Sequence, residues 1–221
     1  GEDVYAVRYN QNKAYVVTFE QTDPLYVIDV SDPALPQMQG TLEIPGFSSY
    51  LQPFGNDLLL GIGQQVDVQQ RPQTGEQPAS ELPVQSMKIS LFDVRDPANP
   101  QELAGVEKES TYTPVEFDYR ALSVLTTDTG TRFGLPYESW ESQGDTAQVT
   151  LTNGLLVLDV DHASASPSLT PVRTVVPKPE NDFYIYGGED RSVLTEQGVY
   201  YLRGNSVYFA EYETDVITGP F

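Results

Sequence analysis

Acidic side chains are the most abundant source of reactive groups in this sequence. The 221 residues include 32 Asp and Glu against 12 Lys and Arg, which gives a formal net charge of -20. Two carboxylates that flank a glycosidic bond can cleave it as acid and base. Three close pairs have the required residue types: Glu116 with Asp118, Glu20 with Asp23, and Glu180 with Asp182. Solvated turn carboxylates are the competing interpretation, so a carbohydrate-active enzyme is the alternative function.

Other catalytic chemistries find no support in the residue types. The single histidine, His162, lies in a polar turn, and there is no cysteine. Nucleophilic mechanisms of the Ser-His-Asp or Cys-His kind need a positioned base. The sequence also lacks a Gly-rich phosphate loop, a His pair at metal spacing and an EF-hand loop. We therefore expect no enzyme and no cofactor, with Ca²⁺ bound by carboxylate oxygens as the open alternative.

The charge balance restricts the class of partner. Neutralising phosphates requires clustered Lys and Arg, so we expect no binding to nucleic acid or anionic lipid. No run approaches the roughly 18 apolar residues needed to span a bilayer, so no membrane span is expected. A basic protein or a polysaccharide is the expected partner. Solubility in a salty medium explains the acidity equally well.

Aromatic residues are the candidate binding groups. They gather at three places where one repeat passes to the next: Phe47, Tyr50 and Phe54; Tyr112, Phe117 and Tyr119; and Phe183, Tyr184 and Tyr186. Packing between sheets competes with an exposed binding role for these rings. Trp140 lies in a polar segment, where an aromatic ring is a typical interface anchor. The predicted binding residues are Tyr50, Tyr112, Asp118, Tyr119 and Trp140.

A repeated strand–turn–strand pattern must position these residues. The stretch 24–44 returns as 89–106 and more loosely as 155–175. Each copy is a β-rich run followed by a turn, made by Asp32-Pro33 in the first copy and by Asp96-Pro97 in the second. In the third copy Asp161-His162 stands where an Asp-Pro would be, so that turn is expected to be made differently. A metal-binding role for the neighbouring Asp29, Asp93 and Asp159 is the alternative to turn chemistry.

The pattern predicts an all-β, propeller-like fold in one domain, 1–221. We expect about four blades of four antiparallel strands, over 1–45, 46–108, 109–177 and 178–221, with exposed loop insertions at 64–86 and 138–147. The third blade is expected to begin with an extended segment over 114–117. Four blades are few for a closed ring, so an incomplete ring or a fragment of a larger propeller is the alternative. Open sheet edges would then favour self-association.

Several segments resemble a family of bacterial secreted proteins with a C-terminal β-propeller domain distantly similar to WD40 repeats. The matching segments are 4–9, 14–19, 23–33, 44–51, 60–63 and 88–94. The family often carries histidines at two places that are here Gln52 and Tyr119-Arg120, so no histidine role carries over. The resemblance implies a fold and a secreted or periplasmic location in the bacterial cell envelope, and no mechanism. From the residue types discussed above we expect a non-catalytic binding or scaffold module.

Overall fold

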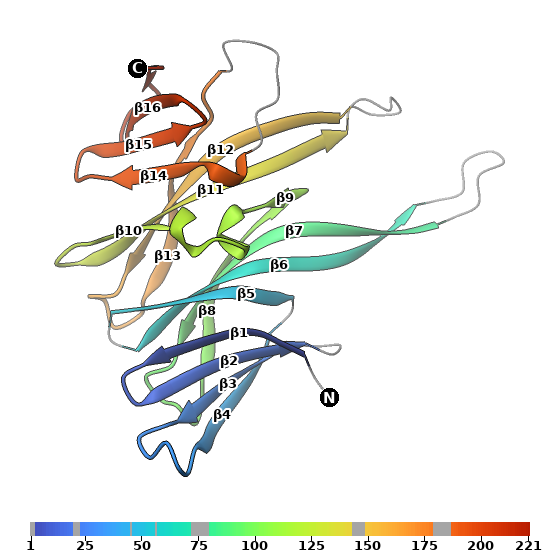
Figure 1. The fold of residues 1–221 in the computed structure, drawn as a ribbon, viewed down its shortest axis with the longest axis vertical. Helices are drawn as coiled ribbons and strands as arrows, with labels where there is room; N and C mark the ends of the chain where they lie inside the picture. The colour runs from blue at the N-terminus through green and yellow to red at the C-terminus, as the bar shows by residue number, and fades with distance from the viewer. Residues whose placement is uncertain are drawn as a thin grey trace.

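The computed structural model describes residues 3–19, 23–44, 46–55, 57–71, 80–142, 149–178 and 187–221. These residues form four antiparallel sheets, each with four strands that pair in chain order, and a fifth short strand joins one of them (Figure 1). The only helical segments in these ranges are three short 3-10 turns. The predicted all-β, propeller-like fold of about four blades is therefore confirmed.

The first sheet shows how the sequence specifies a meander. It contains β1 (Asp3–Asn10), β2 (Lys13–Phe19), β3 (Asp23–Asp29) and β4 (Gln37–Ile44). Gln11 has a φ of 54° in the turn between β1 and β2. Between β3 and β4, the carboxylates of Asp29 and Asp32 accept hydrogen bonds from the backbone N–H groups of Ser31 and Ala34. These Asx turns reverse the chain as predicted.

The second sheet contains β5 (Phe47–Phe54), β6 (Leu58–Arg71), β7 (Ser80–Asp93) and β8 (Gln101–Glu109). A Cβ on Gly63 would collide with the carbonyl oxygen of Phe47, so only glycine allows β5 and β6 to approach so closely. The exposed loop predicted for 64–86 is wrong at both ends, because 64–71 and 80–86 continue the β6–β7 ladder to the pair Arg71 and Ser80. Backbone pairing continues through this Gln-rich stretch, in which Val66 and Val68 alternate with polar residues. Residues 72–79 lie outside the described ranges.

The third sheet contains β10 (Ser123–Thr126), β11 (Gly130–Ser142), β12 (Val149–Asp161) and β13 (Ser168–Val175), with β9 (Thr111–Tyr112) added beside β11. The loop predicted for 138–147 is wrong over 138–142, where β11 continues to pair with β12. Residues 143–147 lie outside the described ranges. The extended segment predicted for 114–117 is also wrong, because two 3-10 turns, η1 (Pro114–Glu116) and η2 (Tyr119–Ala121), occupy this region.

The fourth sheet contains β14 (Arg191–Leu194), β15 (Gly198–Arg203), β16 (Ser206–Glu211) and β17 (Ile217–Thr218), preceded by the 3-10 turn η3 (Gly187–Glu189). In the third and fourth sheets the β10–β11 and β14–β15 turns use the same device. In each, a threonine hydroxyl, of Thr127 or Thr195, pairs with the backbone of a glycine three residues on. Local turn chemistry thus fixes the register of both hairpins.

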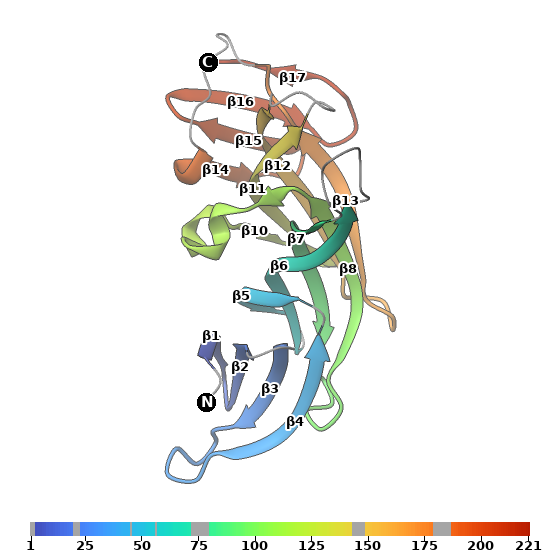
Figure 2. The same cartoon turned by 90° about the vertical axis from the view of Figure 1, so that its right-hand side faces the viewer.

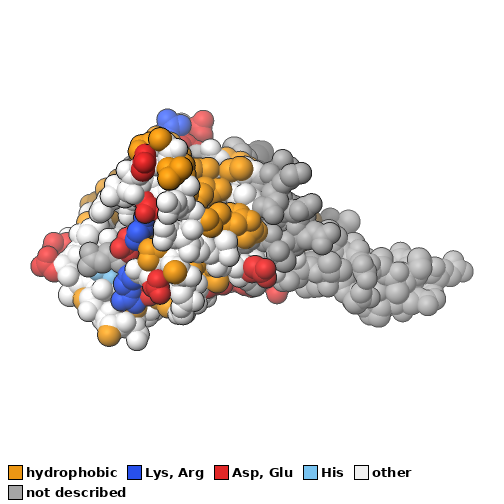
Figure 3. All heavy atoms as spheres, turned by 90° about the horizontal axis from the view of Figure 1, so that it is seen from below, with side chains coloured by type: hydrophobic (Ala, Val, Ile, Leu, Met, Phe, Trp, Pro, Cys, Tyr) orange, Lys and Arg blue, Asp and Glu red, His pale blue; other side chains and the backbone are white. Residues whose placement is uncertain are grey.

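Apolar side chains form a core at each of the three contacts between successive sheets. Tyr15, Leu25 and Val27 meet Leu59 and Phe92 between the first two sheets. Similar clusters join the second sheet to the third and the third to the fourth. The sheets follow one another in an arc, with the β1–β4 and β14–β17 sheets at opposite ends (Figure 2). Viewed from the β1–β4 end, the surface includes a group of hydrophobic side chains (Figure 3).

Candidate functional site

The two 3-10 turns between β9 and β10 form a compact projection, which we call the knuckle (residues 114–121). It is drawn as two short green coils near the middle of Figure 1. Thr113 caps η1 because its hydroxyl accepts a hydrogen bond from Val115 N–H, while the Glu116 carboxylate accepts one from Thr113 N–H. Pro114 supplies a suitable φ at the first position. The Thr113 hydroxyl also donates to the carbonyl oxygen of Pro136 over 2.7 Å, which fixes the cap to β11.

Glu116 ties the knuckle to the second sheet. Its carboxylate accepts hydrogen bonds from Gln64 Nε2, at 3.2 and 3.1 Å, and from Ser49 Oγ at 3.3 Å. Burial raises the pKa of this carboxyl group, and the hydrogen bonds from Gln64, Thr113 and Ser49 oppose that rise. Gln64 lies on β6 and Ser49 on β5. The carboxylate therefore connects the knuckle to two strands of the neighbouring sheet.

Asp118 ties the knuckle to the fourth sheet. Its side chain caps η2 by accepting from Arg120 N–H, and it also accepts from Arg120 Nε at 2.9 Å. Arg191, at the start of β14, donates to the second carboxylate oxygen over 2.6 Å. The hydrogen bond from the Arg120 side chain lowers the pKa of Asp118, with further lowering from the charges of Arg120 and Arg191. The knuckle is thus braced from both sides.

Two aromatic side chains project from this braced element. Phe117 is 84% exposed and Tyr119 is 62% exposed. Arg120 is exposed beside them, whereas Val115 and Ala121 are buried beneath. The knuckle therefore presents two aromatic rings and a guanidinium group on a backbone held by its own caps. Of the two aromatic residues, Tyr119 is among the predicted binding residues and Phe117 is not.

The structure separates the predicted binding residues into three places. Asp118 and Tyr119 lie together on the knuckle. Tyr112 and Trp140 lie together on β9 and β11, with ring centroids 6.4 Å apart. Tyr50 shares neither surface, because its ring is buried in the core between the second and third sheets, and its hydroxyl donates to Gln52 Oε1. The aromatic residues 183, 184 and 186 lie outside the described ranges.

Where the structure describes them, the carboxylates considered for glycoside cleavage accept hydrogen bonds that stabilise the local fold. Glu116 and Asp118 both cap 3-10 turns, as shown above. Glu20, Glu180 and Asp182 lie outside the described ranges, and the side chain of Asp23 is not described. His162 Nε2 lies 3.1 Å from the hydroxyl of Thr131. Across the described ranges, no three His, Asp or Glu side chains are grouped so that they could hold a metal ion, and calcium binding stays a prediction.

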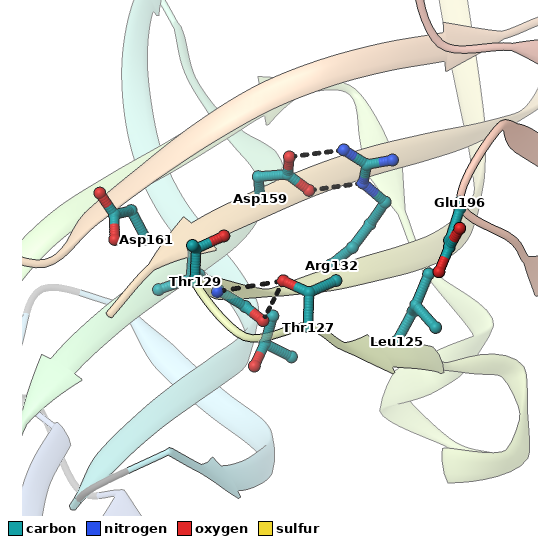
Figure 4. A pocket seen from close by; sticks show the side chains of 10 residues that line it. Leu125, Thr127, Thr129, Arg132, Asp159, Asp161 and Glu196 are labelled. Atoms are coloured by element: carbon teal, nitrogen blue, oxygen red, sulfur yellow. Dashed lines mark hydrogen bonds and ion pairs between the residues drawn. The ribbon is translucent and has the colours of Figure 1, made fainter. Parts of the chain in front are cut away.

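A lateral cleft lies between the third and fourth sheets (Figure 4). Its volume is about 510 Å³, and its lining includes Thr127, Arg132, Asp159, Asp161 and Glu196. The turn of the third repeat was expected to be made differently, but Asp161 forms it as the other turn aspartates do, since its carboxylate accepts from Ala163 N–H. The lining combines the carboxylates of Asp159, Asp161 and Glu196 with the Arg132 guanidinium and with apolar surface from Leu125 and Val160, so it suits a group with both polar and apolar parts.

Arg132 lines the lateral cleft and contacts both of the sheets beside it. Its Nε and Nη2 donate to the two carboxylate oxygens of Asp159 at 2.6 and 2.7 Å, a bidentate geometry visible in Figure 4. The guanidinium carbon also lies 3.8 Å from the centroid of the Tyr212 ring. Hydrogen bonding to Asp159 raises the pKa of Arg132. Because Tyr212 follows β16, this stack joins the third sheet to the fourth.

Replacing Arg132 by methionine should lower the free energy of unfolding by about 2 kcal/mol, through loss of the bidentate pair and the stack. A double-mutant cycle with Tyr212→Leu should give a coupling energy of about 1 kcal/mol in urea unfolding. Arg95→Met is the matched control: Arg95 pairs with Asp93 on an exposed turn, and its loss should cost less than about 0.5 kcal/mol. Equal losses for the two arginine variants would contradict the role given to the stack.

Comparison with known proteins places residues 1–214 within a family model described as a β-propeller domain. An uncharacterized protein of Methanocaldococcus jannaschii is 40% identical over 121 residues, which is 55% of this chain and 17% of that protein. An uncharacterized protein of Archaeoglobus fulgidus is 38% identical over 101 residues, which is 46% of this chain and 13% of that protein. The matched stretches are therefore small parts of both archaeal relatives. No helix within the described ranges is long and apolar enough to cross a membrane.

Proposed function

We propose that this chain, which belongs to the β-propeller domain family, is a non-catalytic binding module that acts outside the cytoplasm and takes a protein partner. Membership of the family supports a binding or scaffold role in general. The resemblance of its segments to secreted propeller proteins supports the extracytoplasmic part. The two relatives are uncharacterized archaeal proteins and add no information on the partner or the cellular location.

The observation that carries the proposal is the exposure of Phe117 and Tyr119 on the braced knuckle. Interface hot spots are enriched in aromatic side chains and arginine, and Arg120 completes that set here. The capping bonds of Thr113 and Asp118 hold the backbone beneath these side chains. A preorganised surface loses less conformational freedom when it binds. The knuckle therefore has the composition and the support of a protein-binding surface.

The carboxylate geometry supports a non-catalytic role for the same region. An acid and a base for glycoside cleavage must face the bond that breaks. Glu116 instead receives hydrogen bonds from Gln64 and Ser49, and Asp118 is paired with two arginines. Both carboxylates stabilise the knuckle, because their oxygens accept hydrogen bonds from other residues of the chain.

A selection with phage-displayed random peptides on the immobilised chain tests the proposal. We expect the enriched peptides to bind the Phe117→Ala/Tyr119→Ala double variant at least about tenfold more weakly than the wild type, measured by surface plasmon resonance. Val124→Ala is the matched control, because Val124 is an exposed apolar residue on the adjacent strand β10. It should bind as the wild type does.

Two results would contradict the proposed function. If the double variant binds the peptides as the wild type does, the knuckle is not part of the interface. The second result is that the wild type releases reducing ends from a panel of cell-wall polysaccharides. If Glu116→Gln loses this activity while its circular dichroism spectrum is unchanged, the chain is instead a carbohydrate-active enzyme.

A further inference from the structure

Among the residues that the structure describes, no further sheet packs on the outer face of either end sheet. Every internal sheet contact buries apolar residues from both sides, as the three cores show. The β1–β4 sheet uses one face for such a contact, and so does the β14–β17 sheet. Side chains alternate between the two faces of a strand, so the residues between the core positions point away from the neighbouring sheet. Both outer faces can therefore be identified from the strand register.

The outer face of the β1–β4 sheet carries two apolar rows. Val7, Val16 and Tyr26 are neighbours across β1, β2 and β3, and Tyr9, Ile28 and Met38 belong to the next row. Tyr9 is 71% exposed, and Val7 and Met38 are also exposed. Figure 3 looks onto this end of the molecule and shows hydrophobic side chains gathered on it. Exposed apolar patches of this kind mark interaction surfaces.

The outer face of the β14–β17 sheet has the same character. Val193, Tyr200 and Phe209 are cross-strand neighbours on β14, β15 and β16, and the rings of Tyr200 and Phe209 lie 4.8 Å apart. Tyr200 is 40% exposed, and Val193 is exposed beside it. The alternate residues Val199, Tyr201 and Ala210 face the third sheet instead. One face of this sheet is thus packed and the other is open.

We infer that these two outer faces are the two halves of one sheet-to-sheet interface, and that a second copy of this chain covers them. Each copy has both halves, so the β1–β4 face of one copy can pack on the β14–β17 face of the other. The contact would continue the packing already present three times within the chain. Two such contacts related by a twofold axis would close a ring of eight sheets, within the range of known propellers.

The faces differ from the sheet edges that the sequence suggested for self-association. An edge contact would add backbone hydrogen bonds to a lone strand. A face contact buries aromatic and aliphatic side chains and needs no such strand. The net charge of -20 on each copy opposes association, so the dimer should be weaker at low ionic strength than near 0.15 M salt.

Native mass spectrometry and light scattering of the purified chain test this inference through two variants. We expect the wild type to be a dimer, and Tyr9→Lys and Tyr200→Glu each to be monomeric when alone. Mixing the two variants should restore a dimer, because one of its two contacts then joins two unaltered faces. Phe117→Ser is the control: it removes an exposed ring from the knuckle and should leave the dimer intact, which separates this test from that of peptide binding.

Each other result would overturn the inference. A wild-type chain that is monomeric at high concentration has no such interface. A dimer that survives both substitutions uses another surface, and a dimer lost in only one variant pairs like faces. Growth into long oligomers would exclude the closed ring of two copies. Circular dichroism of both variants checks that the sheets remain folded, and exposed positions such as these should tolerate the changes.

Discussion

Replacing Phe133 by alanine is expected to lower the free energy of unfolding by about 4 kcal/mol, the largest stability loss we predict for this chain. Phe133 on β11 is fully buried in the core between the second and third sheets. Its ring meets that of Phe54 at 5.1 Å between centroids and an interplanar angle of 76°, the edge-to-face geometry that adds to simple burial. Alanine removes this contact and leaves a cavity between two sheets.

Urea unfolding followed by circular dichroism measures this loss. Phe133→Leu should cost only about 1.5 kcal/mol, because leucine fills most of the volume. Phe117→Ala is the matched exposed phenylalanine and should change stability by less than about 0.5 kcal/mol. A loss below about 1 kcal/mol for Phe133→Ala would show that the two sheets do not depend on this core.

Local sequence signals predicted the repeating unit of the fold. The repeat expected over 24–44 forms the hairpin of β3 and β4. The aspartates expected to form turns, Asp32 and Asp96, accept hydrogen bonds from backbone N–H groups two residues on. Asp161 does so too, although a different turn was expected there. Both signals depend only on residues close together in the chain. The predicted hairpin and turns are present because tertiary packing does not override these local preferences.

The long β6–β7 ladder had a weaker signal. Its outer part runs from the pair Gln65 and Ser86 to the pair Arg71 and Ser80, in a stretch rich in Gln. Val66 and Val68 alternate with polar residues there, which is a strand pattern, but it is short and the many Gln residues favoured a loop. The extension of β11 over 138–142 was missed because its residues are mostly polar, although Glu138 and Ser139 are buried and pair with strands on both sides.

The knuckle shows a signal that was present and not used. Thr113-Pro114-Val115-Glu116 has the capping-box pattern, a Thr followed three residues later by Glu, with Pro at the first position. The pattern predicts the helical turn that replaces the expected extended segment. The exposure of Phe117 and the burial of Tyr50 had no local signal. Both depend on which sheets pack together, so the predicted binding residues include the buried Tyr50 and omit the exposed Phe117.

Stability is also expected to fall as the pH rises from about 4 to about 6, because of Asp190. This side chain is only 1% exposed, between the third and fourth sheets, and its carboxylate accepts from the Tyr201 hydroxyl at 2.5 Å. Burial raises the pKa of Asp190 to about 6, and the charge of Glu138 adds to the rise. Hydrogen bonds from Tyr201 and the Gly204 N–H, and the charge of Arg203, act in the opposite direction.

The sign follows from the proton balance of the two states. With a pKa near 6 in the folded protein and an ordinary value of 3.8 when unfolded, Asp190 holds its proton more tightly in the folded state. The folded state therefore binds more protons between these values, and its stability decreases with rising pH until the group is ionised in both states. The full difference corresponds to about 3 kcal/mol. Asp29, Asp93 and Asp118, whose pKa values are lowered, act below this window and in the opposite direction.

Comparison of the wild type with Asp190→Asn isolates this effect. Urea unfolding between pH 4 and pH 7 should show the decrease in the wild type and a curve flatter by about 3 kcal/mol in the variant, whatever the variant's absolute stability. Tyr201→Phe removes the hydroxyl donor that lowers the pKa of Asp190, so its decrease should extend to higher pH. Parallel curves for the wild type and Asp190→Asn would mean that the carboxylate is not desolvated. The contact between the third and fourth sheets would then be open to water.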